Sequence, residues 1–92
     1  MNLPRYQCHK IVQALKIKAI QKPSRPIDQE DDGERILTFS DEGFEGLAFG
    51  VDHAYMRKHQ PQPGGYYVVY EDDYRSFSPS EAFEAGYTRI ES

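Results

Sequence analysis

Cysteine and tryptophan are nearly absent from this chain: Cys8 is its single thiol, and it has no tryptophan. A lone thiol excludes an intrachain disulfide, and nothing else indicates an oxidising compartment. Apolar runs are short as well. None approaches the roughly 18 residues of a membrane-spanning helix, and the N-terminus has no apolar signal-peptide segment. We therefore expect a soluble, cytoplasmic protein with no membrane partner.

Ligands for a metal site are few and poorly spaced. Cys8 and His9 are adjacent, so on a strand they would point to opposite faces, and His53 and His59 are six residues apart. A structural zinc site requires closely paired ligands, so the sequence predicts no metal site. A nucleophilic Cys8 assisted by a histidine is chemically feasible. No third group that would orient such a pair is recognisable.

Other catalytic and cofactor motifs are also missing. Gly64 and Gly65 lack the lysine and the spacing of a phosphate-binding loop. Glu71, Asp72 and Asp73 form an acidic cluster, but we expect them at an exposed hairpin turn, where carboxylates are usually solvated. The sequence therefore predicts no catalytic residue, no cofactor and a function exerted by binding.

Aromatic side chains, by contrast, are plentiful. The 92 residues include 7 tyrosines and 5 phenylalanines within a hydrophobic content of 38%. Each large ring can bury a large area, which compensates for scarce aliphatic residues. A chain of this length predicts a single domain, residues 1–92, with a thin aromatic core.

Charge is unevenly distributed along the chain, whose net charge is −4. Residues 1–27 contain six bases and no acid, whereas residues 28–45 contain eight acids and one base. The simpler interpretation is that the two segments are neighbours that attract each other. The alternative is an acidic surface that imitates nucleic acid or captures a basic partner. Direct DNA binding is disfavoured, because the acids repel phosphates.

The first half of the chain predicts strands separated by a loop. Apolar residues and lysines alternate within residues 9–21, which favours a strand, although a helical stripe can be drawn through the same segment. Residues 22–34 are polar and contain two prolines, which predicts a mobile acidic loop. Short strands are expected at residues 35–40 and 47–51.

The second half predicts a helix, a hairpin and a second helix. Asp52 can cap a helix that follows it. Residues 66–71 are apolar on both faces, which indicates a central strand or one whose outer face meets a partner. Asp72 and Asp73 are expected to form the hairpin turn. Ser78 is expected to cap the second helix through a capping box.

Together these segments predict an α+β fold. Its sheet would be small, twisted and mostly antiparallel, with five or six short strands that can curl towards a barrel. Two short helices would accompany the sheet, and residues 88–90 would add the last strand.

Tyrosines concentrate on the predicted hairpin and near the two ends of the chain. A tyrosine offers a large contact area at low entropy cost, so a sheet face that carries several of them beside arginines can stack bases or grip a partner. Core packing is the alternative role for these rings. The predicted binding surface consists of Tyr66, Tyr67, Tyr70, Tyr74, Arg75, Tyr87 and Arg89.

Two segments carry a resemblance to known proteins. Residues 5–17 match the pattern RYxCHKxVxALKI, and residues 64–90 match GGYYVVYxDxYxSxSPxEAFExGYTxI. In these segments the chain resembles a diverse group of small phage and prophage proteins of unknown function, which have a glycine where Asp73 stands here. The resemblance implies a phage origin and a small mixed α/β or barrel-like fold, and it implies no activity.

Three functional hypotheses follow. The first is a non-catalytic phage accessory protein in the host cytoplasm, most concretely an inhibitor of an anti-phage defence system that contacts a host protein or sequesters a nucleotide-type small molecule. The second is a minor structural or assembly protein of a phage particle. The third is a small hydrolase that uses Cys8 and a histidine. Exposed edge strands and the tyrosine hairpin also favour a homodimer.

Overall fold

The computed structural model describes residues 3–7, 11–24, 26 and 28–89. The predicted α+β class is confirmed, with two short helices beside one sheet. In chain order the elements are β1 (Arg5–Gln7), β2 (Ile11–Gln21), β3 (Arg35–Phe39), β4 (Ala48–Val51), α1 (His53–His59), β5 (Tyr66–Val69), β6 (Arg75–Ser78), α2 (Ser80–Gly86) and β7 (Thr88–Arg89). The described residues form seven strands rather than five or six; the additional strand is β1, which at three residues is too short to leave a periodic pattern in the sequence.

The long strand β2 organises the sheet. It pairs with β1 through residues 11–13, with β5 through residues 13–16 and with β3 through residues 17–21. This confirms the strand interpretation of the alternating segment over the helical one. A register shift between Ile17 and Ala19 marks an irregularity in the pairing with β3. Such a bulge lets a strand bend, which helps β2 to serve partners in different directions.

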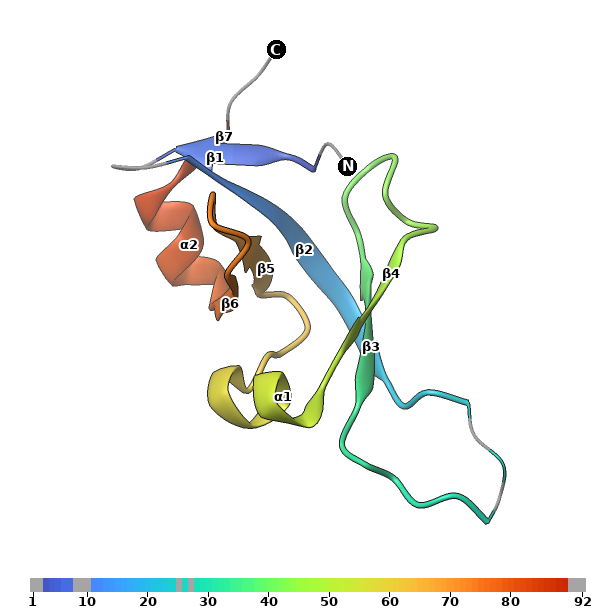
Figure 1. Ribbon diagram of the computed structural model, residues 1–92. Helices are drawn as coiled ribbons and strands as arrows, with labels where there is room; N and C mark the ends of the chain where they lie inside the picture. Colours follow the sequence, from blue (N-terminus) through green and yellow to red (C-terminus); the bar gives the residue numbers. More distant parts are fainter. Residues whose placement is uncertain (1–2, 8–10, 25, 27, 90–92) are drawn as a thin grey trace.

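All seven strands of the described residues belong to one sheet, and each pairing is antiparallel. One path through the sheet is β4-β3-β2-β1-β7, and the β5–β6 hairpin branches from β2. The sheet does not close into a barrel, so the predicted curling stops short of closure. Figure 1 shows β2 extending from the end of the molecule that carries β1 and β7 to the end that carries β3 and β4, with α2 near the first end.

Strand β5 is buried on both faces, as the sequence predicts for a central strand. It lies between β2 and β6. Tyr67 and Val69 belong to a core cluster with residues of β2, β3 and β4, whereas Tyr66 and Val68 belong to a second cluster that contains Phe83 of α2. The second face of β5 is therefore covered by the chain's own helix rather than left for a partner.

Helix α1 begins where the sequence predicts. Asp52 is its N-cap, and the carboxylate accepts a hydrogen bond from the amide of Tyr55 at 2.8 Å. This satisfies one of the amide groups that a helix leaves unpaired at its start. Within the described part of the chain, no helix is both long and apolar enough to cross a membrane.

The predicted capping box of α2 is wrong. Ser78 is the last residue of β6, where it pairs with Tyr66, and its hydroxyl donates to the carbonyl of Pro79. The N-cap is Pro79, and no side chain caps the helix. Strand pairing fixes Ser78 in an extended position one residue too early for it to reach the helix amides.

Glu84 instead fastens α2 to the sheet. Its carboxylate accepts hydrogen bonds from the Tyr66 hydroxyl at 2.7 Å and from the Ser80 hydroxyl at 3.1 Å. It also lies 3.5 Å from the ammonium group of Lys16 on β2. The Tyr66 hydrogen bond, followed by those of Ser80 and Lys16, lowers the pKa of Glu84. The second aromatic cluster is thus held by a charged contact at its edge.

The two oppositely charged segments meet at a few points. Lys22 pairs with Asp31 at 3.8 Å, and the backbone amide of Lys16 donates to the Asp41 carboxylate. The guanidinium of Arg35 donates two hydrogen bonds to Asp31, at 2.9 and 3.0 Å, and lowers the pKa of Asp31 to about 2. Asp31 lies in the loop before β3 and Asp41 in the loop after it. These contacts therefore join the first loop to β3 and the second loop to β2.

Replacing Gly65 with alanine will lower the free energy of unfolding by about 1–3 kcal/mol, the usual cost of overpacking a core. A Cβ atom at this position would overlap the ring of Phe77 and lie 2.9 Å from the carbonyl oxygen of Ser78. Urea unfolding measures the loss. Gly50→Ala is the matched control, because no atom lies within 4 Å of a Cβ there. We expect it to be as stable as the parent or more stable by up to about 1 kcal/mol, because alanine loses less backbone entropy than glycine within a strand; equal losses in both variants would contradict the packing argument.

Glu84→Gln will alter the acid stability of the protein. Because the folded-state pKa of Glu84 lies below its ordinary value of 4.5, its carboxylate stabilises the fold above that pH, and this contribution is lost as the pH falls through the folded-state pKa. The stability difference between parent and variant should therefore be largest above 4.5 and shrink below it. Urea midpoints across this range measure it. Glu30→Gln, in an exposed loop, controls for the loss of one acid, and a difference that is independent of pH would refute the assignment.

Candidate binding surface at the β5–β6 hairpin

The seven residues predicted to form a binding surface do not share one face. Tyr66 and Tyr67 are 6% and 3% exposed and point to opposite sides of β5. Burial of both rings is a correction to their predicted role. Tyr70 and Tyr87 are half-buried, and Tyr74, Arg75 and Arg89 are exposed.

Tyr66 belongs to an aromatic stack beneath α2. Its ring stacks on Phe83 at 4.2 Å between centroids, and Phe83 stacks on Tyr87 at 4.6 Å. Tyr6 of β1 meets Phe83 edge-on at 4.7 Å. Burial and the hydrogen bond to Glu84 raise the pKa of Tyr66, so the phenol stays neutral. These rings serve mainly to pack the core, the alternative role that the sequence allows.

Tyr67 performs the same task on the other face. Its ring lies 5.5 Å from Phe49 and 6.0 Å from Tyr55, and its hydroxyl accepts a 2.7 Å hydrogen bond from the guanidinium of Arg75. Arg75 is thereby committed to a tyrosine of the same hairpin. The Tyr55 hydroxyl in turn donates to the carbonyl of Ser76 on β6, and burial raises the pKa of Tyr55.

The hairpin turn spans three residues rather than the predicted two. The amide of Asp73 donates to the carbonyl of Tyr70, and the amide of Tyr70 donates to the carbonyl of Tyr74. Asp73 has a φ of 65°, in the left-handed region. A tight turn followed by one left-handed residue is a standard three-residue hairpin loop. The carboxylate of Asp72 supports it by accepting the amide of Tyr74.

Tyr74 is the most accessible aromatic side chain of this tip. It is 41% exposed, and among the described residues no other large hydrophobic side chain is exposed. Its ring stacks beside Tyr70 at 5.9 Å, and the Lys58 ammonium lies 5.1 Å from its centroid. Its hydroxyl lies 3.3 Å from Nε2 of His59, whose pKa is lowered by burial.

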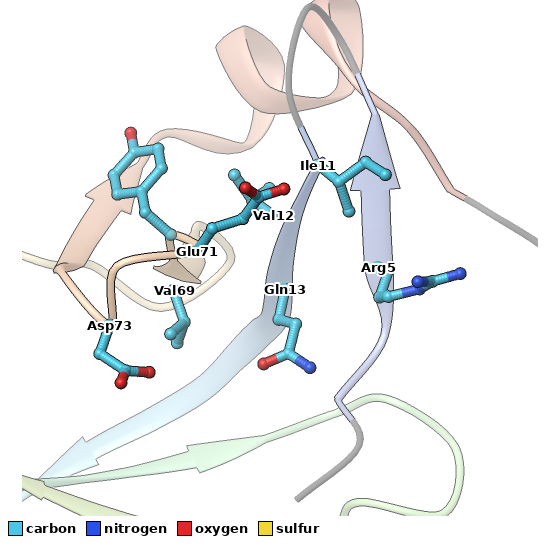
Figure 2. Close-up of a pocket in the computed structure, with 8 residues that line it drawn as sticks. Arg5, Ile11, Val12, Gln13, Val69, Glu71 and Asp73 are labelled. Carbon is cyan, nitrogen blue, oxygen red and sulfur yellow. The ribbon is translucent and has the colours of Figure 1, made fainter.

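Shallow hollows surround the hairpin tip. One, of about 400 Å³, is lined by Tyr70, Glu71, Asp72 and Tyr74. Another, of about 330 Å³, lies between the tip and strands β1 and β2, as Figure 2 shows. Its lining consists of Arg5, Ile11, Val12, Gln13, Val69, Tyr70, Glu71 and Asp73. The two hollows share Tyr70 and Glu71, so the tip presents a continuous surface with both polar and apolar parts.

The residues considered for catalysis or metal binding are not brought together in the described structure. Cys8 and His9 lie outside the described residues, so the Cys8–histidine hypothesis stays a prediction. His53 begins α1 and His59 ends it. Among the described residues, no group of three or more histidine, cysteine and acidic side chains is arranged to hold a metal ion.

Sequence analysis missed the contribution of α1 to this surface. Tyr55 and His59 are four residues apart, so they lie on one face of the helix, with their rings 4.7 Å apart. Lys58 joins them at Tyr74. The spacing of the tyrosine and histidine was available as a signal, but nothing in it says which strand the helix face would meet.

Comparison with solved structures finds a phage protein of similar fold. The fold is similar to the solution structure of the monomeric form of the phage L decoration protein, with a TM-score of 0.64 and 25% sequence identity. The similarity covers 95% of this chain and 59% of the phage L protein, so the chain spans less than two thirds of its length. No family model and no curated protein matches the chain.

This similarity supports a phage accessory or structural role in general terms. It favours the second hypothesis, a structural protein of the particle, over the first. It gives no support to inhibition of a host defence system. The resemblance of the two terminal segments to small phage proteins stays a prediction.

Asp73→Gly will be more stable than Asp73→Ala by about 1 kcal/mol, because a left-handed residue strains every side chain with a Cβ atom. Urea unfolding of the two variants measures the difference. The same pair at Asp72 is the control, since Asp72 has no positive φ. There the order should reverse, because glycine loses more backbone entropy on folding. The same order at both positions would contradict the turn geometry.

Proposed function

We propose that this protein is a structural accessory of a phage particle and acts by binding the particle surface, as a decoration protein does. The observation that carries the proposal is the similarity to the phage L decoration protein over 95% of this chain. The function is binding, without catalysis, and the partner is a protein of the particle. The phage L protein is longer than this chain. A role like that of the whole phage L protein is therefore part of the proposal and is not given by the similarity itself.

The hairpin tip is the surface best suited to such contact. It combines the exposed ring of Tyr74 with the carboxylates of Glu71, Asp72 and Asp73, and Tyr70 and Glu71 line both hollows. Aromatic side chains in a polar surround are typical of the positions that contribute most to binding at protein interfaces. Tyr66, Tyr67 and the rest of the aromatic core position this tip without reaching a partner themselves.

Inhibition of a host defence system, by contact with a host protein or by sequestering a nucleotide, is the less favoured function. No comparison bears on a host partner. The homodimer expected from the sequence stays a prediction, and an open sheet edge such as that of β4, which pairs with β3 alone among the described strands, would be the place for it.

Particles purified by density gradient from cells that carry the gene will contain the protein. Mass spectrometry measures its copy number relative to the major capsid protein. Particles from a strain that lacks the gene are the control, and purified protein added to them should co-sediment and saturate. Protein that is abundant in the lysate but absent from both particle preparations would contradict the proposal. A host protein recovered with it instead would favour the inhibitor.

A further inference from the structure

The outer edge of β4 carries backbone groups that no other strand of the described residues pairs. The amide of Ser40, just after β3, donates to a carbonyl of β2 at 3.0 Å. Backbone groups point alternately to the two sides of a strand, so those of Leu37 face β4. Leu37 lies opposite Phe49, so the backbone groups of Phe49 face β3. The amides and carbonyls of its neighbours Ala48 and Gly50 therefore face outward, and both residues are exposed.

Within the described structure, the edge of β4 lacks the charges, prolines and covering segments that commonly protect a sheet edge. The β6 edge has two such features. It begins with the charged Arg75, and α1 packs against it through the hydrogen bond from the Tyr55 hydroxyl to the Ser76 carbonyl. By contrast, β4 contains no charge and no proline, and a Cβ atom on Gly50 would meet no atom within 4 Å. The edge of β4 is therefore open to a further strand.

A hollow of about 430 Å³ continues the β4 edge to the hairpin tip. Gly50 and Asp52 line it on the side of β4, and Asp73, Tyr74 and Arg75 line it on the side of the tip. All five residues are exposed. The other lining residues are buried or half-buried, so a partner would meet mainly these five. A chain that lies along β4 could therefore also contact the exposed ring of Tyr74.

We propose that the β4 edge binds an extended, basic segment of the particle protein as an added strand. The segment would pair with the outward backbone groups of Ala48 and Gly50 and continue across the hollow to Tyr74. In this mode of recognition the main-chain hydrogen bonds supply affinity, and the side chains beside them supply specificity. That the partner is a protein of the particle rests on the proposed function, whereas the addition of a strand rests on the open edge.

Charge complementarity favours a basic segment over the alternatives. Residues 41–52, which include β4, contain four acids and no base. Around the hollow, Asp52 and Asp73 outnumber Arg75. Lysine or arginine side chains beside the added strand would therefore be attracted. A second copy of this chain would bring the same acids together, and a nucleic acid would bring phosphates towards them, so like charges disfavour both.

The first test needs no particle. Amide proton shifts of the isotopically labelled protein are measured during titration with the peptide acetyl-Lys-Thr-Val-Thr-Lys-amide. One control peptide has glutamate in place of both lysines, and the other keeps the lysines but carries methyl groups on its three central amide nitrogens. We expect saturable downfield shifts at Ala48 and Gly50 as their amides gain hydrogen bonds. The glutamate peptide should bind weaker by about threefold or more, and the methylated peptide should not produce these shifts. Shifts that are absent, equal with the methylated peptide or confined to another part of the molecule would overturn the proposal.

The second test uses particles that lack the protein. Gly50→Pro removes an outward amide and leaves the pairing with β3 intact, as proline does on an edge strand. Gly50→Ala is the matched control, because it adds a side chain and keeps the amide. We expect Gly50→Pro to bind particles about tenfold more weakly than Gly50→Ala, since it loses a main-chain hydrogen bond to the added strand. Urea unfolding verifies the fold of each variant, and Ala48→Pro, at the first residue of β4, replaces Gly50→Pro if the latter does not fold.

The outcomes separate the edge from the particle role. If a folded proline variant binds particles like Gly50→Ala, the inference is overturned while the proposed function stands. If the parent protein binds no particles, the proposed function fails, and the peptide titration alone decides whether the edge accepts a strand. If sedimentation velocity finds a dimer that Gly50→Pro abolishes, and the basic peptide does not bind, a second copy occupies the edge, which also overturns the inference.

Discussion

Burial of β5 on both faces is the constraint on which the rest of the structure depends. A strand between two neighbours has its backbone groups paired, so its side chains can be apolar on either side. The chain is short, and it uses this one strand to serve two clusters at once. Tyrosines fill both faces because the chain has few aliphatic residues, and the tyrosine rings supply the buried area instead. Their hydroxyls then require partners, and these partners are Glu84 on one face and Arg75 on the other.

Those two polar contacts determine what is left for binding. Glu84 is used to hold α2, and Arg75 is used to hold Tyr67, so neither is available to a ligand without loosening the fold. The hairpin tip lies beyond this network. Glu71 and Asp73 are parts of the turn, and their side chains form no hydrogen bond or ion pair with the other described residues. The molecule therefore separates a committed aromatic core from an uncommitted acidic tip, although both come from a single continuous segment.

The sequence predicts the fold class well where periodicity decides it. The alternation in β2, the strand pattern of β5 and the Asp52 cap each depend on local chemistry, and each is confirmed. The prediction that Ser78 caps α2 is wrong because Ser78 pairs with Tyr66 across the sheet, and this pairing overrides its preference for a helix cap. The predicted tyrosine surface is wrong for Tyr66 and Tyr67 for a related reason. A strand that is apolar on both faces looks the same whether its second face meets a partner or the chain's own α2, and Phe83 decides between them only in three dimensions.

The candidate site was harder to predict than the fold because it combines segments that are far apart in the sequence. Glu71, Asp72 and Asp73 appear in sequence as an ordinary solvated turn, and most such turns are that and no more. In the structure this turn lines one hollow together with Arg5 of β1 and residues 11–13 of β2, which lie more than fifty residues earlier in the chain. The aromatic clusters that pack on both faces of β5 thus determine where the tip of its hairpin lies.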